Sequence, residues 1–140
     1  MRIGDLFLKE VISVEPTATV GEAARQMDEH GVGAIVVAEQ QRPVGIVTDR
    51  DVAIALGTGR TARDDQVQDI MTCPPLTLHE RDGIFTACQQ MKEKTVRRLP
   101  VVDDIGRLIG IVTLDDLLLL LSQELQNLAQ GIRPEVAAAK

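Results

Sequence analysis

The sequence predicts an α/β fold of two tandem copies of one unit, each running strand–helix–strand–strand–helix around a small mixed sheet. The octet "GIVTDRDV" at residues 45–52 returns as "GIVTLDDL" at 110–117. The chain from Ile3 also runs in step with the chain from Val67, with a one-residue slip between 39–43 and 103–108. Because that slip lies in a polar, turn-like segment, where an extra residue is tolerated, the two copies are expected to be structurally equivalent.

Each copy begins with a short strand and an amphipathic helix. The segments "VISVE" (11–15) and "LTLH" (76–79) alternate apolar and polar residues, as half-buried strands do. Apolar residues then follow the i, i+3, i+4, i+7 spacing of a helix face, at positions 20, 23, 24, 27 and again at 84, 87, 88, 91. Thr19 and Gly31 are typical of the two ends of the first helix, whereas the second copy offers only Asp82 or Gly83 at its start.

The rest of each copy is a predicted hairpin followed by a second helix. "AIVVA" (34–38) and "PVGIVT" (43–48) are β-branched runs around a polar turn, and "RLPVV" (98–102) opens the equivalent hairpin. The second helices are expected to begin at Thr48 and Thr113. This organisation predicts a first domain over 1–60, a linker over 61–66, a second domain with an extended C-terminal helix over 67–130, and a flexible tail over 131–140.

Composition excludes several classes of protein. The net charge of −6 and the near absence of aromatic residues argue against a nucleic-acid partner, which requires basic surfaces or stacking platforms. The longest apolar run, Leu117 to Leu121, is far shorter than a membrane span, so no membrane partner is expected. Two cysteines and the lack of an export signal predict a cytoplasmic protein.

The repeated Thr-x-x-Asp motif has two interpretations. Thr48 with Asp51, and Thr113 with Asp116, fit a capping box, which would contribute only about 1 kcal/mol to stability. However, the preceding Gly-Ile-Val strand is repeated as well, so a whole strand-to-helix junction recurs. Such a junction places a hydroxyl and a carboxylate beside a helix N-terminus, where phosphate is attracted and ribose hydroxyls can be bound.

These segments, in this order and twice over, resemble a tandem pair of CBS domains, named after cystathionine β-synthase. The resemblance runs from about Ile3 to Leu121 and rests on "VGEAARQM", "GAIVV" and "GIVTDRDV", then "DIMT", "RRLPVV" and "GIVTLDDL". It implies two repeats packed about a pseudo-twofold axis, with two clefts between their sheets. In this family the clefts often hold AMP, ATP, NAD or S-adenosylmethionine, and the Ser/Thr and Asp of the motif bind the ribose.

The resemblance therefore implies ligand-binding roles for Thr48 with Asp51 and for Thr113 with Asp116. The two copies differ in charge beside these motifs: Asp49-Arg50 corresponds to Leu114-Asp115, and Gly33-Ala34 corresponds to Arg97-Arg98. We expect Arg50 and one of Arg97 or Arg98 to contact phosphate, because a guanidinium matches its oxygens. The alternative is that these arginines are solvated surface residues.

The C-terminal helix predicts a homodimer. Leu114, Leu118, Leu121, Leu125 and Leu128 step by 4, 3, 4, 3, and further leucines widen the stripe. The dimer interface is expected at Leu117, Leu118, Leu121 and Leu125, with the first-copy helix (49–56) nearby. Burial of this stripe wholly within one chain is the alternative.

The expected function is a regulatory sensor of an adenosine-containing ligand (AMP, ADP, ATP, NAD or S-adenosylmethionine), acting on an unidentified effector protein. No cofactor is required, no metal site is expected, and no catalytic residue is assigned. The main alternative is a ligand-free homodimeric interaction module. An enzyme using the carboxylate pairs Asp49/Asp51 and Asp115/Asp116, with Mg²⁺, is a weaker third interpretation, because no nucleophile or base accompanies them.

Overall fold

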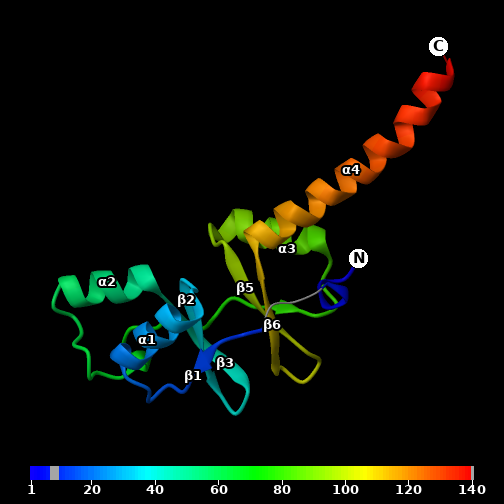
Figure 1. Cartoon of the computed structure of the whole chain (residues 1–140). Coiled ribbons are helices and arrows are strands. Elements are labelled where there is room, and N and C mark those ends of the chain that lie inside the picture. The colour runs from blue at the N-terminus through cyan, green and yellow to red at the C-terminus, as the bar shows by residue number, and fades with distance from the viewer. Residues whose placement is uncertain (7–9, 140) are drawn as a thin grey trace.

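The computed structural model describes residues 1–6 and 10–139, and the side chains of 1–6 and 10–132. The elements follow the order predicted from the repeat (Figure 1). The first copy contains a 3₁₀ turn (Ile3–Asp5), β1 (Ser13–Val14), α1 (Val20–His30), β2 (Ala34–Glu39), β3 (Arg42–Thr48) and α2 (Asp49–Gly57). The second contains a 3₁₀ turn (Val67–Asp69), β4 (Leu78–His79), α3 (Ile84–Lys94), β5 (Arg98–Val102), β6 (Leu108–Thr113) and α4 (Leu114–Ala139).

Each copy has a three-stranded mixed sheet, which confirms the predicted fold class. The orders are β1-β2-β3 and β4-β5-β6, and in each sheet the first pair is parallel and the second antiparallel. Both hairpins carry a register irregularity at the same place, after Val37 in β2 and after Val101 in β5. The hairpin tips meet, since the Leu108 N–H donates to the Gln41 carbonyl at 2.8 Å.

The helix ends confirm part of the sequence analysis. The Glu22 N–H donates to the Thr19 hydroxyl at 3.0 Å, and Gly31 ends α1 in the left-handed conformation at φ 61°. The second copy begins α3 at Gly83 without a side-chain cap. Thr95 takes the place of Gly31 at φ 54°, a conformation that is uncommon for a β-branched residue.

The first residues of each copy pack into the other copy, which the sequence did not reveal. Ile3 is fully buried in the second core, and its N–H donates to the Asp82 carbonyl at 2.7 Å. At the equivalent position Val67 is fully buried in the first core, and its N–H donates to the Ala18 carbonyl at 2.7 Å. Figure 1 shows the N-terminus lying beside the second copy accordingly. Through this exchange of N-terminal segments, each copy contributes a buried residue to the hydrophobic core of the other.

This exchange predicts that Ile3→Ala destabilises the protein through the second copy. Removing a fully buried Ile side chain is expected to lower the free energy of unfolding by about 2–5 kcal/mol. Urea unfolding measures the loss, and amide hydrogen exchange locates it. Faster exchange confined to β1–β3 would contradict the packing of Ile3 against the second core.

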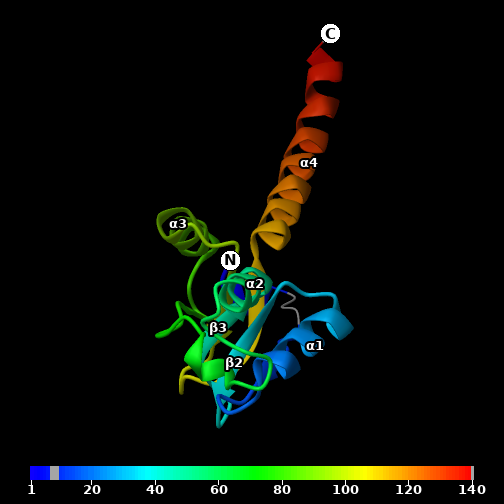
Figure 2. The same ribbon diagram turned by 90° about the vertical axis from the view of Figure 1, so that its left-hand side faces the viewer.

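Helix α4 extends away from the two copies as an arm (Figure 2). Its base is anchored because Leu117 is 1% exposed within the second core, so Leu117 belongs to that core and cannot form part of an exposed dimer face. Beyond the base, the apolar stripe is exposed at Leu118, Leu121, Leu125, Leu128 and Ile132. The helix also continues to Ala139, through the segment predicted as a flexible tail.

Candidate ligand-binding clefts

The large cleft, of about 750 Å³, lies between the start of α2 and the second copy. The junction motif contributes Thr48, Asp49, Arg50 and Asp51. The second copy contributes the chain before β4, the end of α3 and the start of β5, through Pro74, Pro75, Leu76, Lys94, Thr95, Val96, Arg97, Arg98, Leu99 and Pro100. The second copy therefore supplies aliphatic side chains and prolines together with three cations, Lys94, Arg97 and Arg98, and the first copy supplies the junction motif.

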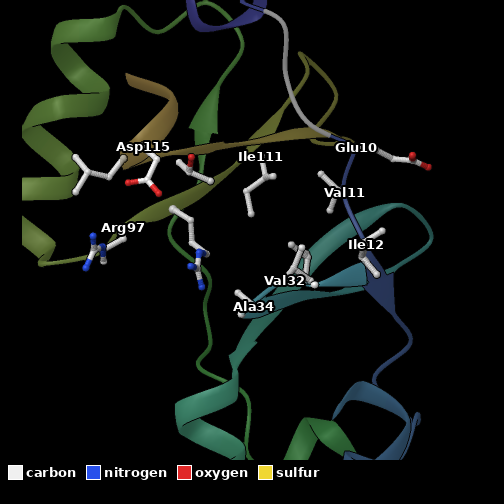
Figure 3. A pocket seen from close by; sticks show the side chains of 14 residues that line it. Glu10, Val11, Ile12, Val32, Ala34, Arg97, Ile111 and Asp115 are labelled. Atoms are coloured by element: carbon white, nitrogen blue, oxygen red, sulfur yellow. The ribbon is translucent and has the colours of Figure 1, made fainter. Parts of the chain in front are cut away.

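The small cleft, of about 280 Å³, lies between the start of α4 and the first copy (Figure 3). Thr113, Leu114 and Asp115 come from the second junction motif. Its remaining lining comes from the first copy and from β5 and β6, through Glu10, Val11, Ile12, Gly31, Val32, Gly33, Ala34, Val36, Arg97, Arg98 and Ile111. Figure 3 shows Arg97 and Asp115 on one side of the cleft, and Val32, Ala34 and Ile12 across from them.

The two clefts are related by the internal repeat. Thr48 in one corresponds to Thr113 in the other, Ile46 to Ile111, and Leu76 to Ile12. In both, the junction after the hairpin of one copy faces two segments of the other copy, the chain before its first strand and the start of its first hairpin strand. Neither cleft can therefore form from a single repeat.

Charge breaks this symmetry. Arg50 in the large cleft is replaced by Asp115 in the small cleft, and Pro74 by Glu10. Arg97 and Arg98 line both clefts, whereas their first-copy counterparts are Gly33 and Ala34.

Both Thr-x-x-Asp motifs form capping boxes. The Thr48 N–H donates to Asp51 Oδ2 at 2.9 Å, and the Asp51 N–H donates to Thr48 Oγ1 at 3.1 Å. The corresponding distances for Thr113 and Asp116 are 3.2 and 3.1 Å. A capping role does not exclude a ligand, since a carboxylate accepts at two oxygens and a hydroxyl both donates and accepts.

The arginines at the clefts are not held by carboxylates. Among the described residues, Arg50, Arg97 and Arg98 form neither an ion pair nor a side-chain hydrogen bond. Arg98 reaches across to the first copy: a Cβ placed on Gly33 would lie 3.4 Å from Arg98 Nη1 and 3.3 Å from Asp49 Oδ2. The absence of a side chain at position 33 therefore leaves room for the Arg98 guanidinium between the clefts.

The structure brings most of the predicted site residues to the clefts. Thr48, Arg50 and Asp51 line the large cleft, Thr113 lines the small cleft, and Arg97 and Arg98 line both. Asp116 differs, because it lies at a separate hollow with Leu6, Ile111, Val112, Leu119, Leu120 and Gln123. Sequence reasoning missed Lys94 and Glu10, whose only signal is their position next to cleft-forming segments.

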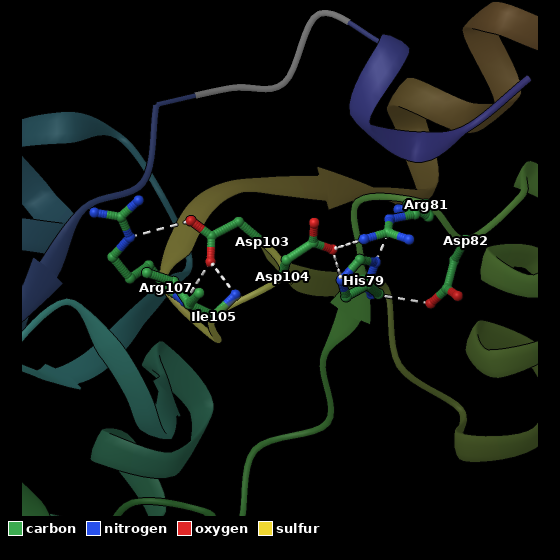
Figure 4. Close-up of polar contacts among 7 residues, drawn as sticks. All are labelled: His79, Arg81, Asp82, Asp103, Asp104, Ile105 and Arg107. Carbon is green, nitrogen blue, oxygen red and sulfur yellow. Dashed lines mark hydrogen bonds and ion pairs between the residues drawn. The ribbon is translucent and has the colours of Figure 1, made fainter.

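A polar cluster away from both clefts fastens the β5–β6 turn to the chain after β4 (Figure 4). Asp104 pairs with Arg81 and lies 2.9 Å from His79 Nε2. The hydrogen bond from Arg81 lowers the pKa of Asp104, and that from the Arg107 N–H lowers the pKa of Asp103. Because both pKa values are lowered in the folded state, each ionised carboxylate stabilises the fold when the pH is above the ordinary pKa of 3.8. This contribution to stability is lost as the pH falls from 3.8 through the lowered pKa.

Neither a metal-binding cluster nor a membrane-spanning helix is found within the part of the chain that the structure describes. No group of three or more His, Cys, Asp or Glu side chains is placed to hold a metal ion there. No described helix combines the length and apolar character needed to cross a bilayer.

Comparison with known proteins identifies the family of this architecture. The CBS domain matches residues 3–58 and again residues 67–123. The chain belongs to the CBS-domain family. It carries two CBS domains in tandem, as the sequence resemblance implied.

The relatives of this chain differ in how much of their own length the match covers. The CBS domain-containing protein YhcV of Bacillus subtilis is 40% identical over 117 residues, covering 82% of this chain and 81% of YhcV. The uncharacterized protein MK0525 of Methanopyrus kandleri is 41% identical, covering 83% of this chain but 60% of that protein. Inosine-5'-monophosphate dehydrogenase of Methanocaldococcus jannaschii is 36% identical, but the match spans only 22% of the enzyme.

Two solved structures that share the fold were determined with adenosine-containing ligands. The CBS domain protein PAE2072 of Pyrobaculum aerophilum, complexed with AMP, superposes with a TM-score of 0.78 at 27% identity, covering 88% of this chain and 99% of that one. The CBS domain pair of protein MJ0100, in complex with 5'-methylthioadenosine and S-adenosyl-L-methionine, also has a TM-score of 0.78 at 27% identity, covering 89% and 98%.

Proposed function

We propose that this protein is a regulatory module that binds an adenosine-containing ligand in the clefts between its two CBS domains. The observation that carries the proposal is the large cleft, which is lined by a Thr-x-x-Asp junction, by aliphatic side chains and by three arginines without carboxylate partners among the described residues. Its volume of about 750 Å³ lies within the range typical of small-molecule sites. The adenosine ligands of the CBS pairs PAE2072 and MJ0100 support the same ligand class.

Each part of the large cleft suits one part of an adenine nucleotide. The aliphatic side chains of Ile46, Leu76 and Val96 suit the flat base. Asp51 and Thr48 suit the ribose hydroxyls, because a carboxylate accepts two hydrogen bonds and a hydroxyl can donate. The guanidinium groups of Arg50 and Arg98 suit the phosphate, since they present forked donors to its oxygens.

The proposed role is regulatory rather than catalytic. The cleft carboxylates Asp49 and Asp51 lie at a helix start, and Asp51 already accepts a backbone N–H there. No described cluster is placed to hold a catalytic metal. We propose that ligand binding changes how the chain interacts with a separate effector protein, or with a second copy of the chain.

Isothermal titration calorimetry tests this proposal. The full chain is titrated with AMP, ADP, ATP, NAD, S-adenosylmethionine and adenosine, with GMP as a control for base selectivity. Micromolar binding of at least one adenine compound, with GMP at least tenfold weaker, is expected. Absence of heat and of any thermal shift with every adenine compound at 1 mM would contradict the proposal.

A second candidate function, homodimeric interaction through α4, is favoured by the exposed arm. Leu118, Leu125 and Leu128 are 56%, 67% and 66% exposed, and Glu124 is the one charged residue between 117 and 132. The stripe steps by 3 and 4 from Leu118 to Ile132, as in a coiled-coil seam. A second copy is the fitting occupant, because an uncharged seam of this kind is complementary to itself and offers no counter-charge to an ionic partner.

Light scattering at 50 µM tests the α4 dimer. The wild type is expected to be dimeric, and Leu125→Glu to be monomeric, because it places an unpaired carboxylate in the seam; a weakening of at least 100-fold is expected, about 3 kcal/mol. Gln126→Glu, one residue away and off the stripe, introduces the same charge and should stay dimeric. A monomeric wild type, or equal effects of the two variants, would contradict the dimer.

A further inference from the structure

We infer that the two clefts are specialised, so that one chain holds one phosphorylated nucleotide in the large cleft and one uncharged nucleoside in the small cleft. This inference rests on the proposed function and assigns a different ligand class to each cleft. It follows from the charges that the two junction motifs place at equivalent positions, and from one arginine pair that both clefts share.

The two clefts carry opposite charges at one equivalent position. Arg50 follows Thr48 by two residues and lines the large cleft. Asp115 follows Thr113 by two residues and lines the small cleft. A phosphate placed over the α2 junction therefore meets a guanidinium, whereas the same phosphate over the α4 junction meets a carboxylate and is repelled.

The two clefts also differ in the balance of charge along their full linings. The large cleft also carries Lys94 and so contains four cations against two carboxylates, Asp49 and Asp51. The small cleft contains the cations Arg97 and Arg98 against the carboxylates Glu10 and Asp115. The large cleft is therefore suited to an anion, and the small cleft to a ligand without charge.

The two clefts share one pair of arginines. Arg97 and Arg98 line both clefts, and the equivalent first-copy positions are Gly33 and Ala34, so a second pair does not exist. A nucleotide phosphate in the large cleft engages these guanidinium groups. A second phosphate in the small cleft would then have to compete for the same donors while lying close to the first phosphate, which is a like charge.

Volume agrees with this assignment. The small cleft, at about 280 Å³, is slightly below the usual range for small-molecule sites, whereas the large cleft lies well within that range. Apolar surface at Ile12, Val32 and Ile111 is available for a base in the small cleft. A nucleoside without phosphates needs less room and brings no charge to Asp115.

Calorimetry and equilibrium dialysis of the full-length wild type test the inference. AMP is expected to bind at one equivalent per chain, with any second equivalent at least tenfold weaker. Protein saturated with AMP is then expected to bind one equivalent of adenosine without releasing AMP. Two AMP molecules bound with affinities within threefold of each other would overturn the inference, as would AMP-saturated protein that takes up no adenosine.

Two variants at one position sharpen the test. Asp115→Arg gives the small cleft the counterpart of Arg50 and is expected to strengthen the second AMP equivalent at least tenfold. Asp115→Asn removes the repulsion without supplying a guanidinium, so it should produce a smaller gain, and in each variant the gain is measured as the change in AMP affinity relative to adenosine affinity. If Asp115→Arg binds adenosine normally yet still takes only one AMP, the assignment of ligand class by this charge is wrong.

These results separate the inference from the proposed function. If neither AMP nor adenosine binds to the wild type, the proposed function fails and the inference falls with it. If adenosine binds both clefts and AMP does so equally well, the proposed function stands and only the specialisation of the clefts is refuted.

Discussion

Charge reversal at Arg50 is expected to weaken AMP binding about 10- to 100-fold while changing adenosine binding less than threefold. A hydrogen bond to a charged group contributes about 1.5–3 kcal/mol, and every 1.4 kcal/mol is a factor of ten in affinity. Arg50 lines the large cleft and has no ion-pair partner among the described residues, so its replacement breaks no existing contact of that kind. Because adenosine lacks the phosphate, its affinity should change little.

Arg50→Glu is also suited to the test because it should fold normally. Position 50 is exposed in the first turn of α2, where an acidic side chain interacts favourably with the helix dipole. Arg42→Glu is a matched control, since Arg42 is exposed in β3, lines neither cleft and has no ion-pair partner among the described residues. Equal losses of AMP and adenosine affinity in Arg50→Glu, or equal AMP affinities in the two variants, would refute a phosphate contact at Arg50.

Thr48→Ala is expected to lower both stability and ligand affinity, whereas Thr19→Ala should lower stability alone. Both threonines are helix N-caps whose hydroxyl accepts the N–H of the residue three positions later, at 3.1 Å for Thr48 and 3.0 Å for Thr19. Loss of either cap should reduce the free energy of unfolding by about 1 kcal/mol. Only Thr48 lines a cleft, so only its loss should reduce adenosine and AMP affinity, by about tenfold.

This pair of variants separates the two interpretations of the repeated motif. Asp51→Ala extends the test to the carboxylate, with the same loss of affinity expected for adenosine and AMP because the ribose is common to both. Urea unfolding gives the stability of each variant and calorimetry gives its affinity. If Thr48→Ala and Asp51→Ala bind adenosine as tightly as Thr19→Ala does, the Thr-x-x-Asp motif of the large cleft is a helix cap and nothing more.

Local patterns were sufficient to predict the elements. The octet beginning at Gly45 aligned the two copies, and the spacing of apolar residues placed α1 and α3 at their observed positions. These features depend on near neighbours in the chain, which a sequence displays directly. The helix ends predicted at Gly31 and Thr48 are confirmed for the same reason, because capping depends on residues within one turn.

Contacts between the copies could not be predicted in this way. Nothing in the pattern around Ile3 or Val67 indicates that each is buried in the other copy's core. The same limit explains Leu117, which continues a leucine run in sequence but lies on the face of α4 that enters the second core. Asp116 likewise matches Asp51 in the motif, yet it lies at a hollow lined by Leu6 and Leu119 instead of at the small cleft.

A crystal structure of the chain grown with AMP would show whether the large cleft binds an adenine nucleotide through its junction motif. The base is expected against Leu76 and Val96, the ribose hydroxyls within hydrogen-bond distance of Asp51, and the phosphate at the guanidinium groups of Arg50 and Arg98. A large cleft that stays empty at saturating AMP, or a nucleotide bound with no contact to Thr48 or Asp51, would contradict the account.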